Sequence, residues 1–467
     1  AKVRRISRDF YTRLHCSPKG TSFMIAIPQN VLDILRALNE RGHEAYVVGG
    51  CGRDSLLGRT PTDWDVHTSA LPEETAGIFD ALGGYTVAKT GLAHGTLTII
   101  KEHCPVEITT YRVDGAYSDA RHPDAVRFTR SLREDLSRRD FTINAMAYHP
   151  DVGLVDYFSG RADLEARRIC CVGDPDKRFG EDALRILRAL RFASVLEFSL
   201  EKMTGESLHR QACLLRQIAA ERIAAEMNKL LCGPATFPVL MEYPDVFEVI
   251  LPELSPMRDH PQYNAYHKYD IYEHTMRAVQ AAPPLSVLRW VLLLHDSGKP
   301  SCFTRDAEGV GHFYGHPAVS AQITGEVLRR MKLDTATIER AVMLVTYHDV
   351  RLTAKEAEVK RWLRRLGEEA FFQLLEVQKA DVRGQHPDLL YRIQDIEAIG
   401  QTAREVLASQ ACFSLKDLQV NGHDLIQIGI YPGKLLGDTL ETLLEAVIDG
   451  RCPNRKEDLL EMAKAMR

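Results

Sequence analysis

Strand patterns are confined to one part of this 467-residue chain, and this division constrains its fold more than any other feature. Between about residues 45 and 160, short apolar runs bounded by turns predict strands at Ala45–Val48, Asp65–Thr68, Thr96–Ile100 and Val106–Arg112. After about residue 180, apolar residues recur with a period of about 3.6, which predicts helices at Glu181–Ser194, Glu201–Arg216, Glu221–Leu231 and over most of 270–410. The predicted fold class is α+β, a mixed α/β head followed by a long helical body.

Composition excludes several classes of protein. Hydrophobic residues make up 45% of the chain and charged residues 26%, which is the balance of a globular protein. No apolar run approaches the roughly 20 residues that a membrane-spanning helix needs, so we expect no membrane partner. Ten cysteines without C-x-x-C pairs, and without a secretory signal, indicate reduced thiols and predict a cytoplasmic protein. The net charge of −5 means that a polyanionic partner would have to be met by local basic patches.

A glycine-rich turn and two aspartates predict a site for phosphates and metal ions in the head. Gly49, Gly50 and Gly52 lie between a predicted strand and a predicted helix, where glycine lets backbone N–H groups approach phosphates. Asp63 and Asp65 are two residues apart, so on a strand both carboxylates face the same side and can bind the same hard cations. Two Mg²⁺ ions held there would activate a 3′-hydroxyl and stabilise the leaving pyrophosphate. Either motif alone is more often a plain turn or a solvated surface, and their pairing favours the site.

Two further groups extend this candidate site. In the block from Arg138 to Ala147, an arginine can fork onto triphosphate oxygens, although Arg138 alone could be an exposed helix start. Glu107, in the predicted strand Val106–Arg112, is either a third carboxylate of the site or an exposed strand residue. Both interpretations of Glu107 stay open at this point.

Asp182 and Arg185 form a candidate pair for recognising a nucleobase. On one helix they would be neighbours at i and i+3, one an acceptor and the other a fork of donors. Cytosine and adenine both carry an amino group beside an unprotonated ring nitrogen, so this pair would bond either base and refuse guanine and uracil. The alternative is an ordinary ion pair between the two side chains. Arg191 would lie far round the helix from Asp182 and would serve phosphate, RNA or structure.

In this order, the four blocks resemble the class II tRNA nucleotidyltransferase and poly(A) polymerase family over most of residues 24–240. The resemblance implies a polymerase-β-like head followed by neck, body and tail helices. It implies Mg²⁺ at Asp63 and Asp65, and nucleotide binding by Gly50, Arg53, Arg139, Asp182, Arg185, Arg188 and Arg191. Glu221, Arg222 and Glu226 resemble the family's helix motif that supports the base-selecting helix. Gly52 departs from the family, which usually has valine there; this should loosen the turn but removes no ligand.

Imidazoles and carboxylates recur through the predicted helices of the body, where such groups can converge on a divalent metal. The order of His274, His295-Asp296 and Asp381 resembles the HD phosphohydrolase superfamily, over about a quarter of the chain. The resemblance implies that His274, His295, Asp296 and Asp381 hold a metal that activates water for attack on a phosphoester. His316 and His348 match positions that in some members bind a second metal or phosphate. The alternative is a degenerate HD fold kept as a helical scaffold.

The resemblance implies a bacterial CCA-adding tRNA nucleotidyltransferase that uses CTP, ATP and Mg²⁺, grips the acceptor arm and 3′ end of tRNA, and has a hydrolytic HD domain with a second divalent metal of unknown identity. Three alternatives remain: a CC-adding, A-adding or poly(A) polymerase, a hydrolase with a decayed head, and a non-catalytic RNA-binding scaffold. The oligomeric state is not predicted. Residues 113–125, with Gly115, Ser118 and His122, are a candidate for the loop that switches from C to A addition. The expected domains are a tail at 1–23 before a natural start at Met24, a head at 24–165, a neck at 166–255, an HD body at 256–395 and a tRNA-binding tail at 396–467.

Overall fold

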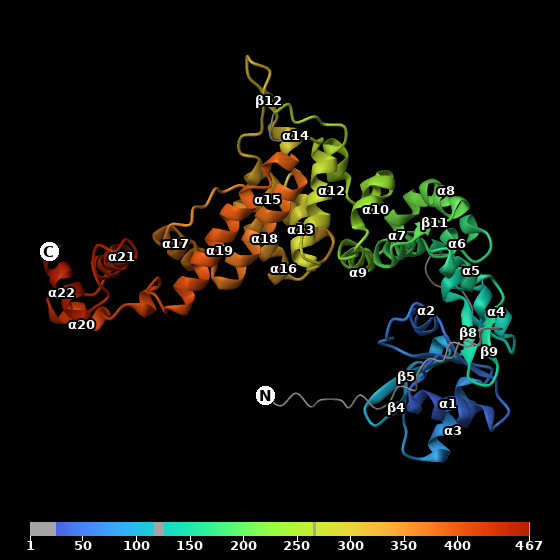
Figure 1. The fold of residues 1–467 in the computed structure, drawn as a ribbon. Coiled ribbons are helices and arrows are strands. Elements are labelled where there is room, and N and C mark those ends of the chain that lie inside the picture. The colour runs from blue at the N-terminus through green and yellow to red at the C-terminus, as the bar shows by residue number, and fades with distance from the viewer. Residues whose placement is uncertain (1–24, 116–125, 265–267, 467) are drawn as a thin grey trace. The chain divides into compact units, whose positions relative to one another are not determined.

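The computed structural model describes residues 25–115, 126–264 and 268–466. The predicted N-terminal tail (1–23) and most of the predicted loop (113–125) therefore lie outside the described residues. The chain divides into two compact units, Ala1–Leu230 and Leu231–Arg467 (Figure 1). This boundary falls inside the segment that we expected to form the neck (166–255), and the finer domain limits stay predictions.

A seven-stranded mixed sheet forms the framework of the first unit. Its order is β3-β4-β5-β2-β1-β8-β9. The strands are β1 (Ala45–Val48), β2 (Asp65–Thr68), β3 (Thr86–Gly91), β4 (Thr96–Lys101), β5 (Cys104–Thr110), β8 (Met146–His149) and β9 (Gly153–Asp156). Strands β2 and β5 run parallel, whereas every other neighbouring pair is antiparallel. Two pairs of short strands complete the unit: β6 (Arg112–Asp114) with β7 (Val126–Phe128), and β10 (Arg168–Ile169) with β11 (Ser199–Leu200).

Helices pack against this sheet and then continue as a helical segment (Figure 1). They are α1 (Gln29–Asn39), α2 (Gly50–Leu56), α3 (Pro72–Leu82), α4 (Leu132–Ser137), α5 (Gly160–Glu165), α6 (Pro175–Glu181), α7 (Leu184–Leu196), α8 (Lys202–Gln211) and α9 (Ala220–Leu231). Short 3₁₀ turns cover Leu92–His94, Thr142–Asn144 and Ala212–Gln217. Apolar residues of α1 and α3, including Leu35 and Phe79, bury themselves against Val47, Val66 and Ile108 of the sheet.

The structure confirms the α+β class and the predicted strands β1 and β2, and it corrects three boundaries. The predicted strand Val106–Arg112 is two strands, because the chain leaves β5 after Thr110 and Arg112 begins β6. The predicted helix Glu181–Ser194 begins only at Leu184, because Asp182 has an extended backbone between α6 and α7. The predicted helix Glu201–Arg216 ends at Gln211 and continues as a 3₁₀ turn.

The second unit is almost entirely helical among its described residues (Figure 1). Its helices are α10 (Thr236–Glu242), α11 (Pro244–Ile250), α12 (Ile271–Ala281), α13 (Ser286–Leu294), α14 (Lys299–Cys302), α15 (His316–Arg330), α16 (Thr335–Tyr347), α17 (Glu356–Leu366), α18 (Glu368–Gly384), α19 (Arg392–Ala408), α20 (Gly422–Gln427), α21 (Lys434–Ile448) and α22 (Lys456–Ala465). Short 3₁₀ turns cover Pro252–Met257, Pro387–Leu389 and Leu415–Asp417, and a small hairpin joins β12 (Thr304–Arg305) to β13 (Gly311–His312).

Helix α13 is the centre of this bundle. Its residues from Leu288 to Leu294 are all buried, as expected for a helix that is apolar on every side. It packs against α12, α16 and α18, so the ends of these helices come together around it. A separate apolar cluster of α20, α21 and α22, including Leu425, Leu443 and Leu459, forms the core of the C-terminal helices.

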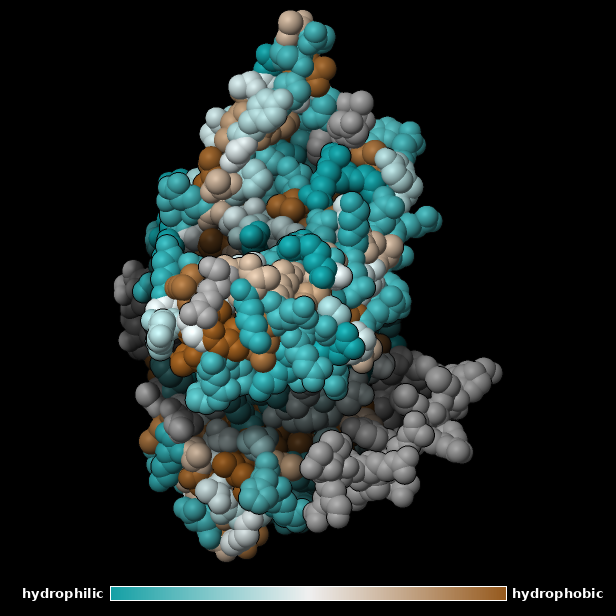
Figure 2. Space-filling model, turned by 90° about the vertical axis from the view of Figure 1, so that its left-hand side faces the viewer, coloured by the Kyte–Doolittle hydropathy of each residue, from teal (hydrophilic) through white to brown (hydrophobic). Residues whose placement is uncertain are grey.

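The described residues contain no helix that is both long and apolar enough to cross a membrane. Hydrophilic residues dominate the face in Figure 2, where hydrophobic residues appear as separate patches.

Candidate active sites in the head and the body

Three carboxylates gather at one edge of strands β2 and β5. Asp65 is the first residue of β2, and the parallel register places Glu107 of β5 directly beside it. Burial raises the pKa of Asp65, and the charges of Glu107 and Asp63 raise it further, while Arg139 opposes them. Like-charged carboxylates at such close range favour a bound cation, and carboxylate oxygens are preferred ligands of hard divalent metals. The register thus favours the interpretation of Glu107 as a third carboxylate of the site.

The turn between β1 and α2 requires glycine. Gly49 has a φ of +79°, and a Cβ atom there would lie 2.8 Å from Nη1 of Arg139. The next helix carries Arg53, whose Nη1 donates to Oδ1 of Asn144 at 2.7 Å. A Cβ at Gly52 would meet no atom within 4 Å, so this departure from the family pattern leaves open space beside α2. The glycine-rich turn therefore serves to let the Arg139 guanidinium approach the backbone.

A chain of three polar side chains holds Arg139 in place. Nη2 of Arg139 lies 3.0 Å from Nε2 of His67, and Nδ1 of His67 lies 2.5 Å from Oδ2 of Asp135. Burial lowers the pKa of His67 to about 4 although Asp135 opposes the shift, so the neutral ring donates to Asp135 and accepts from Arg139. His67 and Asp135 are buried, and Nε of Arg139 is a buried donor without a hydrogen bond to any described residue. The guanidinium is thus fixed and still able to donate to a ligand.

Sequence reasoning missed His67 and Asp135. A signal for His67 was present, because it continues the period-two spacing of Asp63 and Asp65 onto the same face of β2. Asp135 lies on α4 and carries no such signal. Its carboxylate also pairs with Arg138 at 3.0 Å, which gives Arg138 a partner in the site instead of the exposed position that we considered.

A cavity of about 320 Å³ brings the predicted base-selecting residues together with Arg139. Its lining includes Asp182 and Arg185 as predicted, and it carries six arginines against two aspartates: Arg112, Arg138, Arg139, Arg185, Arg188 and Arg222 with Asp140 and Asp182. Such an excess of guanidinium groups suits a polyanionic ligand such as a triphosphate. Arg139 joins this cavity to the carboxylates, since its charge acts on Asp65.

Asp182 and Arg185 do not form the predicted i, i+3 pair on one helix. Asp182 precedes α7 and accepts from the backbone N–H of Leu184 at 3.1 Å, while Oδ2 lies 3.3 Å from Nη2 of Arg222. Arg185 is buried and pairs instead with Glu181 at 2.9 Å. Both the helical pairing and its alternative, an ordinary ion pair between the two, are therefore wrong. The two side chains are anchored separately and meet at the same cavity.

Arg188 and Arg191 are held by structural carboxylates. Nη2 of Arg188 lies 2.6 Å from Oδ2 of Asp140, and Nε of Arg191 lies 2.9 Å from Oε2 of Glu226. Burial alone would raise the pKa of Asp140, but the Arg188 guanidinium holds it below its ordinary value. Arg191 is not part of the cavity lining and stacks over the ring of Phe192 at 4.1 Å. Helix α9 thus supports α7 through Glu226 and reaches the cavity through Arg222.

In the body, the four predicted metal ligands converge at the ends of buried helices. Nε2 of His274 on α12 lies 3.2 Å from Oδ2 of Asp296 and 3.0 Å from Oδ1 of Asp381 on α18. Nε2 of His295, directly after α13, lies 3.3 Å and 3.4 Å from the same two oxygens. Burial would lower the pKa of His295, but the carboxylates of Asp296 and Asp381 outweigh it and raise the pKa to about 10.

Two further histidines extend this cluster. Nε2 of His316, the first residue of α15, lies 3.4 Å from Oδ1 of Asp296, and Nε2 of His348, directly after α16, lies 3.8 Å from that oxygen. The two Nε2 atoms are 3.2 Å apart. Asp296 therefore offers one oxygen to each of two groups of possible metal ligands: His274 with His295, and His316 with His348.

The histidine tautomers suit metal binding. Nδ1 lies within hydrogen-bond range of a backbone carbonyl in His295 (Leu292, 2.7 Å), His316 (Phe313, 2.9 Å) and His348 (Val345, 2.6 Å). A hydrogen on Nδ1 leaves a lone pair on each Nε2, which is the usual arrangement of metal-ligating histidines. In addition, Gln385 donates to Oδ2 of Asp381 at 2.9 Å and accepts from Arg392 at 3.0 Å, which turns Oδ1 of Asp381 towards the histidines. The donor set of this chain thus fits a divalent metal.

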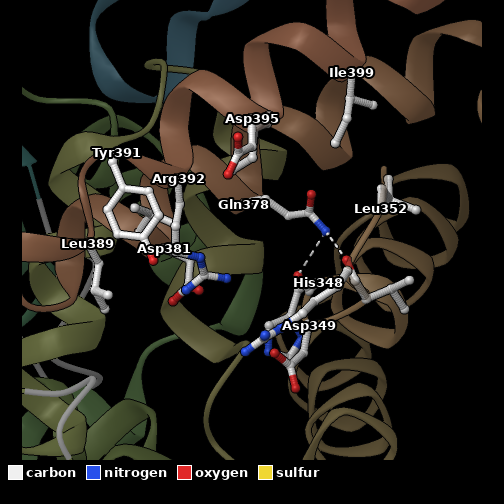
Figure 3. A pocket seen from close by; sticks show the side chains of 14 residues that line it. His348, Asp349, Leu352, Gln378, Asp381, Leu389, Tyr391, Arg392, Asp395 and Ile399 are labelled. Atoms are coloured by element: carbon white, nitrogen blue, oxygen red, sulfur yellow. Dashed lines mark hydrogen bonds between the residues drawn. The ribbon is translucent and has the colours of Figure 1, made fainter. Parts of the chain in front are cut away.

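Two cavities open onto this cluster and share Asp349 and Asp381. One, of about 310 Å³, is lined by His348, Gln378 and Arg392 among others, and Figure 3 shows Arg392 beside Asp381 in this cavity. The other, of about 370 Å³, reaches Asp296 and Lys299. The cluster is therefore buried but accessible from the surface.

Comparison with known proteins places these features in a family. Residues 45–170 match the poly A polymerase head domain, residues 197–258 the probable RNA and SrmB-binding site of polymerase A, and residues 318–463 a putative second domain of tRNA nucleotidyltransferases. The fold and the head site thus define a template-independent nucleotidyltransferase of the poly(A) polymerase head class.

Whole-chain relatives identify the family more narrowly. The chain is 34% identical to a CCA-adding enzyme of Levilactobacillus brevis over 91% of its own length and 95% of the relative, and 35% identical to one of Geobacillus thermodenitrificans over 92% and 95%. The crystal structure of the Bacillus stearothermophilus CCA-adding enzyme in complex with CTP, at 29% identity, matches with a TM-score of 0.68 over 94% of this chain and 98% of that one. The chain belongs to the CCA-adding enzymes, which are tRNA nucleotidyltransferases.

Proposed function

We propose that this protein adds C, C and A to the 3′ end of tRNA from CTP and ATP, with Mg²⁺ as the metal of the head. The carrying observation is the cavity that unites Asp182 and Arg185 with Arg139, next to the carboxylates of Asp63, Asp65 and Glu107. Relatives solved in complexes with CTP, ATP and tRNA support the assignment of these partners.

Each residue of the head then has a role in nucleotidyl transfer. Arg139, fixed by His67, and the arginines around it bind and orient the triphosphate. The three carboxylates hold the metal ions, which when bound activate the tRNA 3′-hydroxyl and stabilise the leaving pyrophosphate. Gly50 and Arg53 belong to the turn that positions the nucleotide against these carboxylates.

Base selection falls to Asp182 and Arg185. Asp182 accepts from the exocyclic amino group of cytosine or adenine, and Arg185 donates to the adjacent ring nitrogen. Guanine and uracil present the reversed pattern, which leaves a buried donor and a buried acceptor unpaired and is strongly unfavourable. The anchors of these side chains, Arg222 and Glu181, restrict them to orientations in which they read one base at a time.

The test uses purified protein and a tRNA that lacks its 3′ CCA. Labelled CTP and ATP are supplied separately and together, and the products are resolved to single nucleotides. Addition of all three nucleotides supports the proposal, whereas addition of CC alone or of A alone identifies a specialist. Homopolymer tails identify a poly(A) polymerase. No addition at all would indicate a hydrolase with a decayed head or an RNA-binding scaffold.

We also propose that the body hydrolyses phosphoesters at the cluster of His274, His295, Asp296 and Asp381, with His316 and His348 as ligands of a second metal. The geometry of the Nε2 atoms around Asp296 favours this function over a degenerate scaffold. A metal there would supply a Lewis acid and lower the pKa of water. The test is hydrolysis of a 2′,3′-cyclic nucleotide by the wild type, His295→Ala and Asp296→Ala, and equal rates in all three would refute it.

A cytoplasmic location and the domain limits given above belong to the same proposal. The nine cysteines among the described residues are all free, which supports a reducing compartment. The expected tRNA-binding tail (396–467) coincides largely with the end of the region that matches a tRNA nucleotidyltransferase domain (318–463).

A further inference from the structure

A stacked pair of rings stands next to the metal-competent cluster of the body. Tyr314 is 76% exposed, and its ring stacks on that of His312 with centroids 5.1 Å apart and an angle of 8° between the planes. His312 is in turn held by Asp306, whose Oδ2 lies 2.7 Å from Nε2. The exposed tyrosine therefore has a fixed support behind it, and neither the addition reaction nor the metal ligands use it.

The hairpin of β12 and β13 sets the direction of these rings. Phe313, between them, packs against Phe303 at 5.5 Å and towards His260. Because successive side chains of an extended chain point to opposite sides, anchoring Phe313 inwards turns its two neighbours the other way. The position of the stacked pair is thus a consequence of the hairpin's own core.

The stacked rings and the cluster line the same cavity of about 370 Å³, together with Lys299. Tyr314 is two residues before His316, so their Cα atoms are at most about 7.6 Å apart. Nζ of the buried Lys299 lies 2.7 Å from Oδ2 of Asp296, which places a cation where a phosphate would meet the cluster. An aromatic surface, a cation and a metal-competent cluster therefore face one volume that is large enough for a nucleoside.

We propose that this cavity binds a nucleoside phosphate, with the base stacked on Tyr314 and the phosphate at the cluster. This inference rests on the proposed hydrolytic function and adds its substrate class. Stacking accepts every base, because each base has a π-face, so the site would select nucleotides over other phosphoesters without selecting a sequence. With a nucleoside 2′,3′-cyclic phosphate, the oxygen of water bonds to phosphorus, one ribose P–O bond breaks, and the freed ribose oxygen takes a proton from that water.

The first experiment compares two substrates that differ in the base. Adenosine 2′,3′-cyclic phosphate carries one, whereas glycerol 1,2-cyclic phosphate does not. Loss of one base–aromatic stack should lower kcat/KM of Tyr314→Ala for the adenosine substrate by about 5- to 100-fold, mainly through KM. Hydrolysis of the glycerol substrate should not change, and Tyr314→Phe, which keeps the ring, should behave as the wild type. Tyr431→Ala is the matched control, because Tyr431 is similarly exposed at 74% but lies among the C-terminal helices.

A binding experiment without catalysis separates this proposal from the hydrolytic function. In metal-free Tyr314→Trp, the added indole emission should be quenched by adenosine 3′-monophosphate and not by glycerol phosphate. If the wild type hydrolyses neither cyclic phosphate with any divalent metal, the hydrolytic function fails, and quenching still decides on the base site. Equal kcat/KM ratios in the wild type and Tyr314→Ala, or an indole at position 314 that the nucleotide does not quench, would overturn the proposed base site.

Discussion

His67 is the residue whose removal most directly tests how the head holds a nucleotide. In His67→Ala, Arg139 loses the acceptor that lies 3.0 Å from Nη2 and keeps only a backbone contact to Asn144 at 3.3 Å. Asp135 keeps Arg138 at 3.0 Å and the backbone N–H of Arg112 at 3.2 Å, so it is not left unpaired. The loss therefore amounts to one charge-assisted hydrogen bond to each neighbour and a small cavity, about 2–4 kcal/mol of folding stability.

The catalytic consequence follows from the guanidinium rather than from stability. A hydrogen bond to a charged group contributes about 1.5–3 kcal/mol, so a mispositioned Arg139 should raise KM for both CTP and ATP by about 10- to 100-fold. We expect a much smaller change in kcat, because the metal-binding carboxylates stay in place. Single-nucleotide addition to a tRNA primer, measured over a range of CTP or ATP concentrations, gives both constants.

Two further variants make this prediction sharp. His67→Gln places an amide oxygen near the position of Nε2 and should restore KM to within a few-fold while part of the stability loss remains. His43→Ala, which removes a half-buried histidine elsewhere in the head, should change neither constant. A folded His67→Ala protein with wild-type KM for both nucleotides would refute the positioning role.

Four other outcomes are expected. Because the folded pKa of His67, about 4, lies below its ordinary value, the unfolded chain binds more protons between pH 7 and 5; the wild type should lose about 2 kcal/mol of stability over this range, and His67→Gln should lose correspondingly less in denaturant titrations at each pH. Asp63→Ala should abolish nucleotide addition and leave cyclic phosphate hydrolysis intact; loss of both would mean that the two sites depend on each other. Gly49→Ala should cost about 1–3 kcal/mol in thermal unfolding through its φ of +79° and raise KM for CTP by displacing Arg139, whereas Gly52→Ala should do neither. Gln385→Ala should weaken Mn²⁺ binding to the body about 10- to 100-fold in calorimetry, and unchanged affinity would show that Gln385 does not orient Asp381.

The sequence predicted what local patterns encode. The period-two spacing of Asp63 and Asp65 placed both at β2, and the apolar run from Leu288 to Leu294 predicted a buried helix. Boundaries were less accurate where the chain breaks a pattern. Helix α7 starts late because the Asp182 side chain accepts from the backbone N–H of Leu184, which favours an extended Asp182 over another helical turn.

Contacts between distant residues could not be predicted in this way. The partners of Asp182, Arg188 and Arg191 come from α9 and from Asp140, and nothing local to α7 identifies them. The net charge of the chain was equally uninformative, since a protein with a net charge of −5 gathers six arginines against two aspartates around one cavity. Local charge is a property of the fold, and it determines which ligand the cavity accepts.

The two candidate metal sites differ in ligand chemistry, and this difference explains how one chain can hold both. The head offers only carboxylates, with Asp63 and Glu107 exposed, and such oxygen ligands suit a hard cation that keeps some of its water. The body offers buried histidines around Asp296, a mixed set that suits transition metals better than Mg²⁺. A metal that fills one site is therefore a poor competitor for the other. Independent activities are expected on this ground, with the addition reaction dependent on Mg²⁺ and the hydrolytic one on a softer divalent ion.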